Sequence, residues 1–170
     1  MSARAHPEFA LRPFLIEDTP LLAEIFRASI EELAADDYNE AQQEAWASAA
    51  DDEEAFAKRL ADQLTLIATM NGSPIGFASL LNNETIDLIY IHPALVGQGA
   101  GTMLMDALEK LAAARGAKRL TADVSDTAQD FFKKRGFTAQ QRNTVLRGGE
   151  WLANTTMDKQ LGKATGQGAA

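Results

Sequence analysis

The sequence predicts an α/β protein with a mixed central sheet of about seven strands, flanked by helices on both faces. Three observations lead to this prediction. Short apolar runs rich in β-branched residues alternate with amphipathic helical segments. A glycine-rich turn joins one such run, residues 86–91, directly to a helix. Turn signals at 71–72 and 147–149 join neighbouring runs as hairpins. The resulting order, one strand, helices, a three-strand meander and then β-α-β-α-β-β, places helices on both faces.

The first third of the chain is predicted to form one strand and three helices. Residues 9–14 have the strand pattern, and Pro20 marks the first turn of the helix that follows. Asn39 and Gln42 are spaced as a capping box for a second helix, and Glu53–Ala61 has the pattern of a third. The first helix has an apolar stripe at helical spacing: Leu22, Ile25, Phe26, Ile30 and Leu33.

The remaining elements follow in regular order. Pro93 ends the strand at 86–91, because proline cannot donate to a sheet ladder. From Thr102 the pattern is helical until Gly116, with leucines recurring on one face. The other predicted elements are strands at 65–70, 75–80, 119–124, 138–147 and 151–158, and a helix at 127–135.

Composition limits the class of protein. With 170 residues, 46% of them apolar, we expect one domain over residues 1–161 and a disordered tail at 162–170. The absence of cysteine excludes disulfides and a cysteine nucleophile. A net charge of −8 argues against binding to nucleic acid or to an anionic membrane. Without a long apolar span or a basic, apolar leader, a cytoplasmic protein is expected.

The glycine-rich turn is a candidate anion site. Gly97, Gly99 and Gly101 leave backbone N–H groups accessible, and the following helix presents free amides and a partial positive dipole, which favour phosphate. The spacing G-x-G-x-G differs from the G-x-G-x-x-G of dinucleotide-binding folds. It also lacks the lysine of a P-loop. A turn that binds no ligand is the alternative.

Two motifs resemble those of the GNAT superfamily of N-acetyltransferases. Residues 96–101 resemble its pyrophosphate loop, Gln/Arg-x-x-Gly-x-Gly/Ala, with Val96 at the first position. Residues 128–137 resemble its later Ala-x-x-x-Tyr-x-x-x-Gly-Phe motif, with Phe132 in place of the tyrosine. Tyr38-x-x-x-Gln42-x-x-x-Trp46 and the element at 147–151 are similar to those of a bacterial subgroup, the YafP-like acetyltransferases.

The resemblance implies the GNAT fold with acetyl-coenzyme A as co-substrate. In that family the pantetheine arm enters a gap beside the strand at 86–91, and a backbone N–H there, of Ile91 or Ile89, donates to the thioester oxygen. Ser125 is implied to bind the pantetheine or to cap a helix, and Thr102 to add a hydroxyl or only to start its helix. The implied cofactor-binding residues are Ile89, Tyr90, Ile91, Val96, Gly97, Gln98, Gly99, Ala100, Gly101, Thr102, Ser125, Phe131 and Phe132.

Asp87 is the first candidate for the base that deprotonates an amine acceptor. Strict strand alternation places it on the face of Ile89 and Ile91, opposite Tyr90. Its apolar neighbours are expected to raise its pKa, while an ordinary salt bridge is the alternative. Glu84 is a second, weaker candidate.

The other catalytic assignments are less direct. Phe132 has no proton to give to a departing thiolate, so Tyr38 is the candidate general acid. His92 titrates in a suitable range but lies at a His-Pro strand exit that many GNAT proteins carry without a catalytic role. Two isolated histidines and no cysteine predict no metal site.

The sequence therefore predicts direct acetyl transfer from acetyl-coenzyme A to a primary amine of a small molecule or protein. The alternative is a catalytically degenerate GNAT domain that binds coenzyme A as a sensor, which the departures at Val96 and Phe132 favour. Ten acidic residues between Glu31 and Glu54 form either solvated helix faces or a negative rim that attracts a cationic amine. A homodimer is a further possibility.

Overall fold

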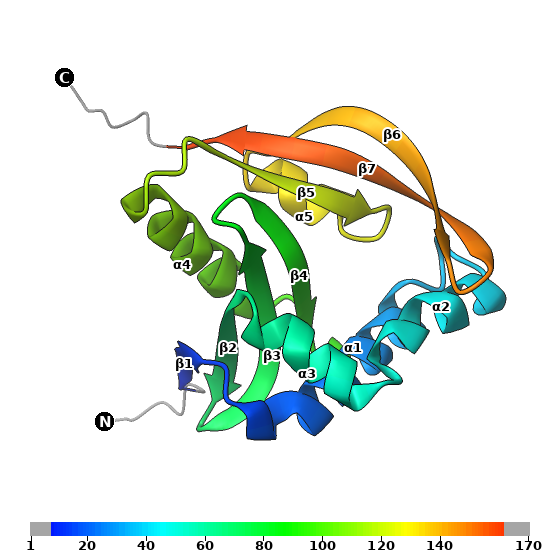
Figure 1. The fold of residues 1–170 in the computed structure, drawn as a ribbon, viewed down its shortest axis with the longest axis horizontal. Coiled ribbons are helices and arrows are strands. Elements are labelled where there is room, and N and C mark those ends of the chain that lie inside the picture. Colours follow the sequence, from blue (N-terminus) through cyan, green and yellow to red (C-terminus); the bar gives the residue numbers. More distant parts are fainter. Residues whose placement is uncertain (1–7, 162–170) are drawn as a thin grey trace.

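A computed structural model describes residues 8–161, which form a seven-stranded mixed sheet in the order β1-β2-β3-β4-β5-β7-β6 (Figure 1). The strands are β1 (Phe9–Pro13), β2 (Leu64–Met70), β3 (Ser73–Leu81), β4 (Thr85–Ile91), β5 (Arg119–Ser125), β6 (Thr138–Arg147) and β7 (Glu150–Gln160). The helices are α1 (Thr19–Leu33), α2 (Glu40–Ala47), α3 (Glu53–Ala61), α4 (Ala100–Ala114) and α5 (Gln129–Lys134). Short 3₁₀ turns lie at Ile16–Asp18, Ser48–Ala50 and Pro93–Leu95. The predicted fold class is confirmed.

Local sequence signals explain most of the element boundaries. The Asn39 side chain accepts from the amide of Gln42, and the Gln42 side chain accepts from the amide of Asn39, so the predicted capping box of α2 is confirmed. Asp52 caps α3 by accepting from the amide of Ala55. The β2–β3 turn is closed by Asn71 at φ 53° and Gly72 at φ 89°, as a tight hairpin requires.

Several predicted boundaries differ from the observed ones, and the two helices α4 and α5 show this most clearly for the site. α4 begins at Ala100 rather than Thr102, because Gly99 at φ 100° is its N-cap and the first turn lacks the apolar residues that mark a helix in a sequence. α5 is shorter than the predicted 127–135. The predicted tail at 162–170 lies outside the described residues, as do residues 1–7.

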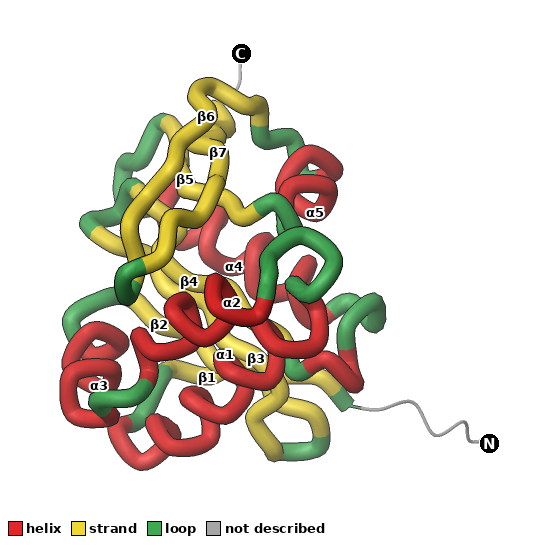
Figure 2. Tube along the Cα trace, turned by 90° about the vertical axis from the view of Figure 1, so that its right-hand side faces the viewer, coloured by secondary structure: helices red, strands yellow, loops and turns green. Residues whose placement is uncertain are grey.

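The helices cover the two faces of the sheet and form two separate cores. α1 and α3 pack on one face, where Phe26 and Phe56 meet Phe77 of β3. α4 and α5 pack on the other face, where Leu104 and Phe132 belong to the second core. Figure 2 shows α1 and α2 on the side of the sheet away from α4. Residues of one strand that point to opposite faces therefore meet different helices.

The sheet opens between its two parallel strands. β4 and β5 share one register pair, Thr85 with Thr121, and diverge beyond it, whereas β5 pairs with β7 along its whole length (Figure 1). The backbone edges of β4 and β5 that face each other are therefore without a sheet partner over most of their length. This opening positions the candidate site.

A β-bulge in β4 changes which residues share a face. Ser79 of β3 pairs with Leu88, but the next residue, Leu80, pairs with Ile86, so Asp87 is an extra residue on β4. Asp87 consequently lies on the α1–α3 face with Tyr90, where it contacts Arg59 of α3. The predictions that Asp87 shares a face with Ile89 and Ile91, and that Tyr90 lies opposite, are wrong because strict alternation fails at a bulge.

Candidate functional site

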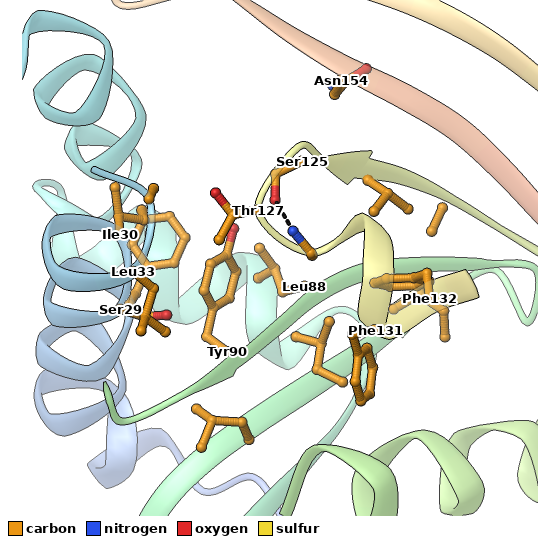
Figure 3. Close-up of a pocket in the computed structure, with 18 of the residues that line it drawn as sticks. Ser29, Ile30, Leu33, Leu88, Tyr90, Ser125, Thr127, Phe131, Phe132 and Asn154 are labelled. Carbon is orange, nitrogen blue, oxygen red and sulfur yellow. Dashed lines mark hydrogen bonds between the residues drawn. The ribbon is translucent and has the colours of Figure 1, made fainter. Parts of the chain in front are cut away.

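A cavity of about 620 Å³ follows the opening between β4 and β5 (Figure 3). Its walls come from α1, α2, α3, β4, the segment from the end of β4 to the start of α4, β5, α5 and the β6–β7 hairpin. Both predicted catalytic residues, Asp87 and Tyr38, line it. So do all of the predicted cofactor-binding residues except Gln98, which is exposed, and Ala100, which is buried in the α4 core. The predicted site residues are thus gathered into one place.

The loop before α4 has the geometry of an anion site. Met103 is the first residue of α4 to donate an amide hydrogen bond into the helix, to the carbonyl of Gly99. The amides of residues 100–102 therefore have no partner within the helix and point out of its N-terminus. A Cβ placed on Gly97 or Gly99 would meet nothing within 4 Å, so open space surrounds this loop. One on Gly101 would lie 3.3 Å from the Phe131 ring.

The β4 edge presents amide groups to the opening. His92 donates its amide to the carbonyl of Ile75 in β3, at 2.8 Å. Amides alternate in direction along a strand, so those of Ile91 and Ile89 point the other way, toward β5. Within residues 8–161 no strand pairs with β4 there, which leaves these two amides available to a ligand in the cavity.

Asp87 is held in an ion pair rather than left free. Arg59 donates to both of its carboxylate oxygens, at 2.9 and 3.1 Å, and Gln63 donates to Oδ2 at 2.8 Å. Burial alone would raise the pKa of Asp87, but these hydrogen bonds and the charges of Arg59 and Arg147 outweigh it and lower the pKa below its usual range. The prediction of a raised pKa is wrong, because Arg59 is distant in sequence and adjacent in space.

Replacing Asp87 by asparagine is expected to destabilise the protein. The change removes a bidentate, charge-assisted contact while Arg59 stays at 39% side-chain exposure, so we expect a loss of about 1 kcal/mol, or about 2–4 °C in Tm. Because the pKa of Asp87 is lower in the folded protein, its ion pair contributes its full stabilisation when the pH is above the carboxyl pKa of the unfolded chain. That contribution is lost as pH falls through the folded pKa. Thermal unfolding from pH 7 to pH 3 measures both effects.

Asp62→Asn is the matched control for that variant. Asp62, the residue that follows α3, pairs with Lys58 of that helix on the surface, with 61% and 75% side-chain exposure, and exposed pairs contribute little to stability. Equal Tm losses in the two variants would contradict a structural role for the Asp87 ion pair.

Tyr38 lines the cavity, but its hydroxyl is engaged on both sides. It donates to the carbonyl of Ala153 at 2.6 Å and accepts from the amide of Asp126 at 2.9 Å. Burial raises its pKa. The phenol therefore joins β7 to the β5–α5 loop, and its proton is committed to a backbone carbonyl. This geometry does not favour Tyr38 as a proton donor.

Tyr90 is the other tyrosine of the cavity wall, and its hydroxyl has a different environment. It accepts a hydrogen bond from the Nε1–H of Trp46 at 3.1 Å. No acceptor for its own proton lies within hydrogen-bond distance among the described residues. Burial raises the pKa of Tyr90 to about 12, so the phenol is neutral at physiological pH. Figure 3 shows the ring between α1 and the β5–α5 loop.

The motif at residues 128–137, together with Ser125 just before it, contributes apolar walls and a turn to the cavity. Phe132 is 3% exposed and packs edge-to-face on Phe137 with 5.0 Å between ring centroids, while the partly buried Phe131 lies beside Gly101. The Oγ of Ser125 accepts from the amide of Ala128 at 3.1 Å, as a helix-capping side chain does, and its own proton is left for another partner (Figure 3).

Sequence reasoning missed several wall residues. Arg59 of α3 lines the cavity but carried no signal, because only the folded sheet brings it, and Gln63 beyond the end of α3, to Asp87 of β4. Arg147 belonged to a quoted turn element, yet its charge was not assigned to the site, and Ser29 of α1 was not considered. None of the ten acidic residues between Glu31 and Glu54 lines the cavity, so a negative rim receives no support.

Fold and site together define a class of protein: an α/β acyltransferase in which a helix N-terminus and an open strand edge meet in one cavity. A family model described as an acetyltransferase (GNAT) domain matches residues 34–161. The chain therefore belongs to the GNAT acetyltransferase family.

Individual relatives agree with this assignment. The chain is 29% identical over 147 residues to an uncharacterized N-acetyltransferase, YafP, of Escherichia coli, covering 86% of this chain and 93% of the relative. It resembles the crystal structure of a GCN5-related N-acetyltransferase from Rhodopseudomonas palustris, with 62% identity, a TM-score of 0.89 and 95% and 99% coverage of the two chains. The PaiA N-acetyltransferase of Thermoplasma acidophilum, solved in complex with coenzyme A, shares the fold at 22% identity and a TM-score of 0.75, with 90% and 99% coverage.

No helix within residues 8–161 is long and apolar enough to cross a membrane. No group of three or more His, Cys, Asp or Glu side chains in this range is arranged to hold a metal ion.

Proposed function

We propose that this protein transfers the acetyl group of acetyl-coenzyme A to a primary amine by direct attack in a ternary complex. The observation that supports this most is the meeting of two features in one cavity: the free amides at the start of α4 and the unpaired amides of Ile89 and Ile91. The first suits a pyrophosphate and the second a thioester arm that lies beside β4 as an extra strand.

The residues present fit coenzyme A. Positive φ angles at Gly97 and Gly99, with open space around both, allow phosphate oxygens to approach the backbone. Val96 replaces the Gln or Arg side chain at the first position of the family motif, but the proposed hydrogen bonds to the pyrophosphate come from the backbone amides. The rings of Phe131 and Phe132 and the free proton of Ser125 offer an apolar surface and one hydrogen bond to the pantetheine arm.

The chemistry requires a neutral amine, a stabilised oxyanion and a leaving thiolate. In the proposed reaction the amine nitrogen attacks the thioester carbon, whose oxygen becomes negative and accepts from the amide of Ile91 or Ile89. The C–S bond then breaks, the C–N amide bond remains, and the proton lost by nitrogen ends on the sulfur or in solvent. Alignment of the two substrates in the cavity supplies much of the rate.

Tyr90 is our choice for the donor that meets the sulfur. Its hydroxyl is oriented by Trp46 and has a proton without an acceptor in the described part of the chain, and Tyr90 lines the cavity. Phe132 has no hydroxyl and Tyr38 has committed its proton to Ala153. Because the pKa of Tyr90 is about 12, the phenol acts by hydrogen bonding to the nascent thiolate rather than by complete proton transfer.

We propose no carboxylate base. The lowered pKa of Asp87 and its bonds to Arg59 and Gln63 make it a weak proton acceptor. The amine therefore loses its proton to water, and turnover should follow the neutral fraction of the acceptor as pH rises. A domain that binds acetyl-coenzyme A without catalysis is the second candidate, which Phe132 at the family's tyrosine position favours.

Two measurements on the purified protein test the proposal. Calorimetric titration with acetyl-coenzyme A should show micromolar binding, and thiol release should rise when a primary amine is added. Binding without amine-dependent thiol release across a broad amine panel would favour the sensor. Failure to bind acetyl-coenzyme A would overturn both functions.

A further inference from the structure

Some charged residues of the cavity wall have a direct partner of opposite charge or a hydrogen bond, and one does not. Four charged residues line it: Arg59, Asp87, Asp123 and Arg147. Arg59 and Asp87 neutralise one another, and Asp123 accepts from the hydroxyl of Thr156. Arg147 has no carboxylate within 4 Å among the described residues. The one hydrogen bond found for it there goes to the carbonyl of Leu146. The wall therefore has one arginine whose charge is not neutralised by a direct partner.

Arg147 lies at the acceptor end of the cavity. Arg147 is the last residue of β6, just before the turn to β7. Gly148 in that turn packs against Ala45 of α2, because a Cβ placed on Gly148 would lie within 3.3 Å of the Ala45 backbone. The charge of Arg147 also helps to lower the pKa of Asp87 on β4, another residue of the cavity wall. The free amides of the α4 loop, the proposed phosphate site, belong to a different wall.

The surfaces near Arg147 are apolar and aromatic. Trp46 and Tyr90 present partly exposed rings 6.5 Å apart at their centroids, in edge-to-face orientation. Further apolar wall residues come from α1 and from the β6–β7 hairpin: Phe26, Ile30, Leu33, Val145 and Leu152. Such a wall suits an apolar or aromatic body rather than an extended polar chain.

We propose that the acceptor is a primary amine that also carries a carboxylate on an apolar or aromatic body, and that Arg147 binds this carboxylate. This inference rests on the proposed acetyltransferase function. A guanidinium presents two parallel N–H donors that match a carboxylate, and it stays charged at every physiological pH. A polyamine or a lysine side chain would need free carboxylates in the wall, and both carboxylates that line the cavity are engaged.

The test compares phenylalanine with phenethylamine, which has the same ring and amine but no carboxylate. Thiol release with acetyl-coenzyme A is measured for wild type and Arg147→Gln. We expect the variant to lower kcat/KM for phenylalanine about 10- to 100-fold more than for phenethylamine, as loss of a charge-assisted hydrogen bond predicts. Arg115→Gln, an exposed arginine at the end of α4 outside the cavity wall, should change neither value.

Equal losses for the two amines in Arg147→Gln would overturn the proposal. So would wild-type preference for spermidine or for a blocked lysine peptide over phenylalanine. Calorimetric titration of phenylalanine in the presence of coenzyme A gives a readout without turnover. Arg147-dependent binding there supports the inference even if no amine is acetylated, and absent binding overturns it. Failure of acetyl-coenzyme A itself to bind contradicts the proposed function instead.

Discussion

Gly99→Glu is expected to reduce acetyl-coenzyme A affinity at least 100-fold. Gly99 is the N-cap of α4 at φ 100° and borders the cavity, so the new carboxylate would occupy the place proposed for the pyrophosphate. Its negative charge would take the helix N-terminal amides for itself and repel phosphate. Calorimetry measures the affinity, and thermal unfolding verifies that the variant is folded.

Gly72→Glu is the control that distinguishes the effect of a negative charge at the site from the effect of backbone strain. Gly72 has a similar angle, φ 89°, also with nothing within 4 Å of an added Cβ, but it lies in the β2–β3 turn. A non-glycine residue at such an angle costs on the order of 1–3 kcal/mol at either position. Affinity within about twofold of wild type for Gly72→Glu, together with its loss in Gly99→Glu, assigns the effect to the loop. Unchanged affinity in Gly99→Glu would remove the loop from the coenzyme site.

Tyr90→Phe is expected to lower kcat about 10- to 100-fold with little change in the KM for acetyl-coenzyme A, because one hydrogen-bond donor to the leaving group is lost. The packing of the ring is kept. Since the pKa of Tyr90 is about 12, the wild-type rate should show no descending limb below pH 10. The variant should lower the whole pH–rate curve without shifting it.

Tyr38→Phe is the informative comparison. Its hydroxyl joins the carbonyl of Ala153 to the amide of Asp126, so the loss should appear mainly in stability, about 1–3 kcal/mol for two backbone groups left unsatisfied. If Tyr38→Phe instead abolished turnover while Tyr90→Phe kept it, the donor would be Tyr38. Trp46→Phe removes the hydrogen bond that orients Tyr90 and should reproduce part of the Tyr90→Phe effect.

Local signals in the sequence predicted the fold well. The bounds of α3 and β6 agree with the predicted residues, and the capping box of Asn39 and Gln42 marks the start of α2. These features depend on residues a few positions apart. The glycine loop was predicted for the same reason, because its conformation is encoded by neighbouring glycines.

The parts that could not be predicted depend on strand pairing and on distant contacts. Nothing near Asp87 indicates a bulge, since a bulge exists only relative to the partner strand β3. The direction of its pKa shift is set by Arg59 and Gln63, more than 20 residues away in sequence. The hydrogen bond from the Tyr38 hydroxyl to the carbonyl of Ala153, 115 positions away, could not be predicted from the sequence either.

The alternation of β4 after its bulge has a consequence for how new specificities arise. Ile89 and Ile91 pack with the α4 core, whereas Leu88 and Tyr90 pack with the α1 core. In the proposed function, the face with Ile89 and Ile91 would thus serve the nucleotide donor, and the face with Leu88 would serve the acceptor. Mutations at Leu88 or on α1 would change the accepted amine, while Tyr90, Trp46 and the coenzyme side stay under separate selection. One fold can in this way acquire new acceptors while its binding of the coenzyme is unchanged.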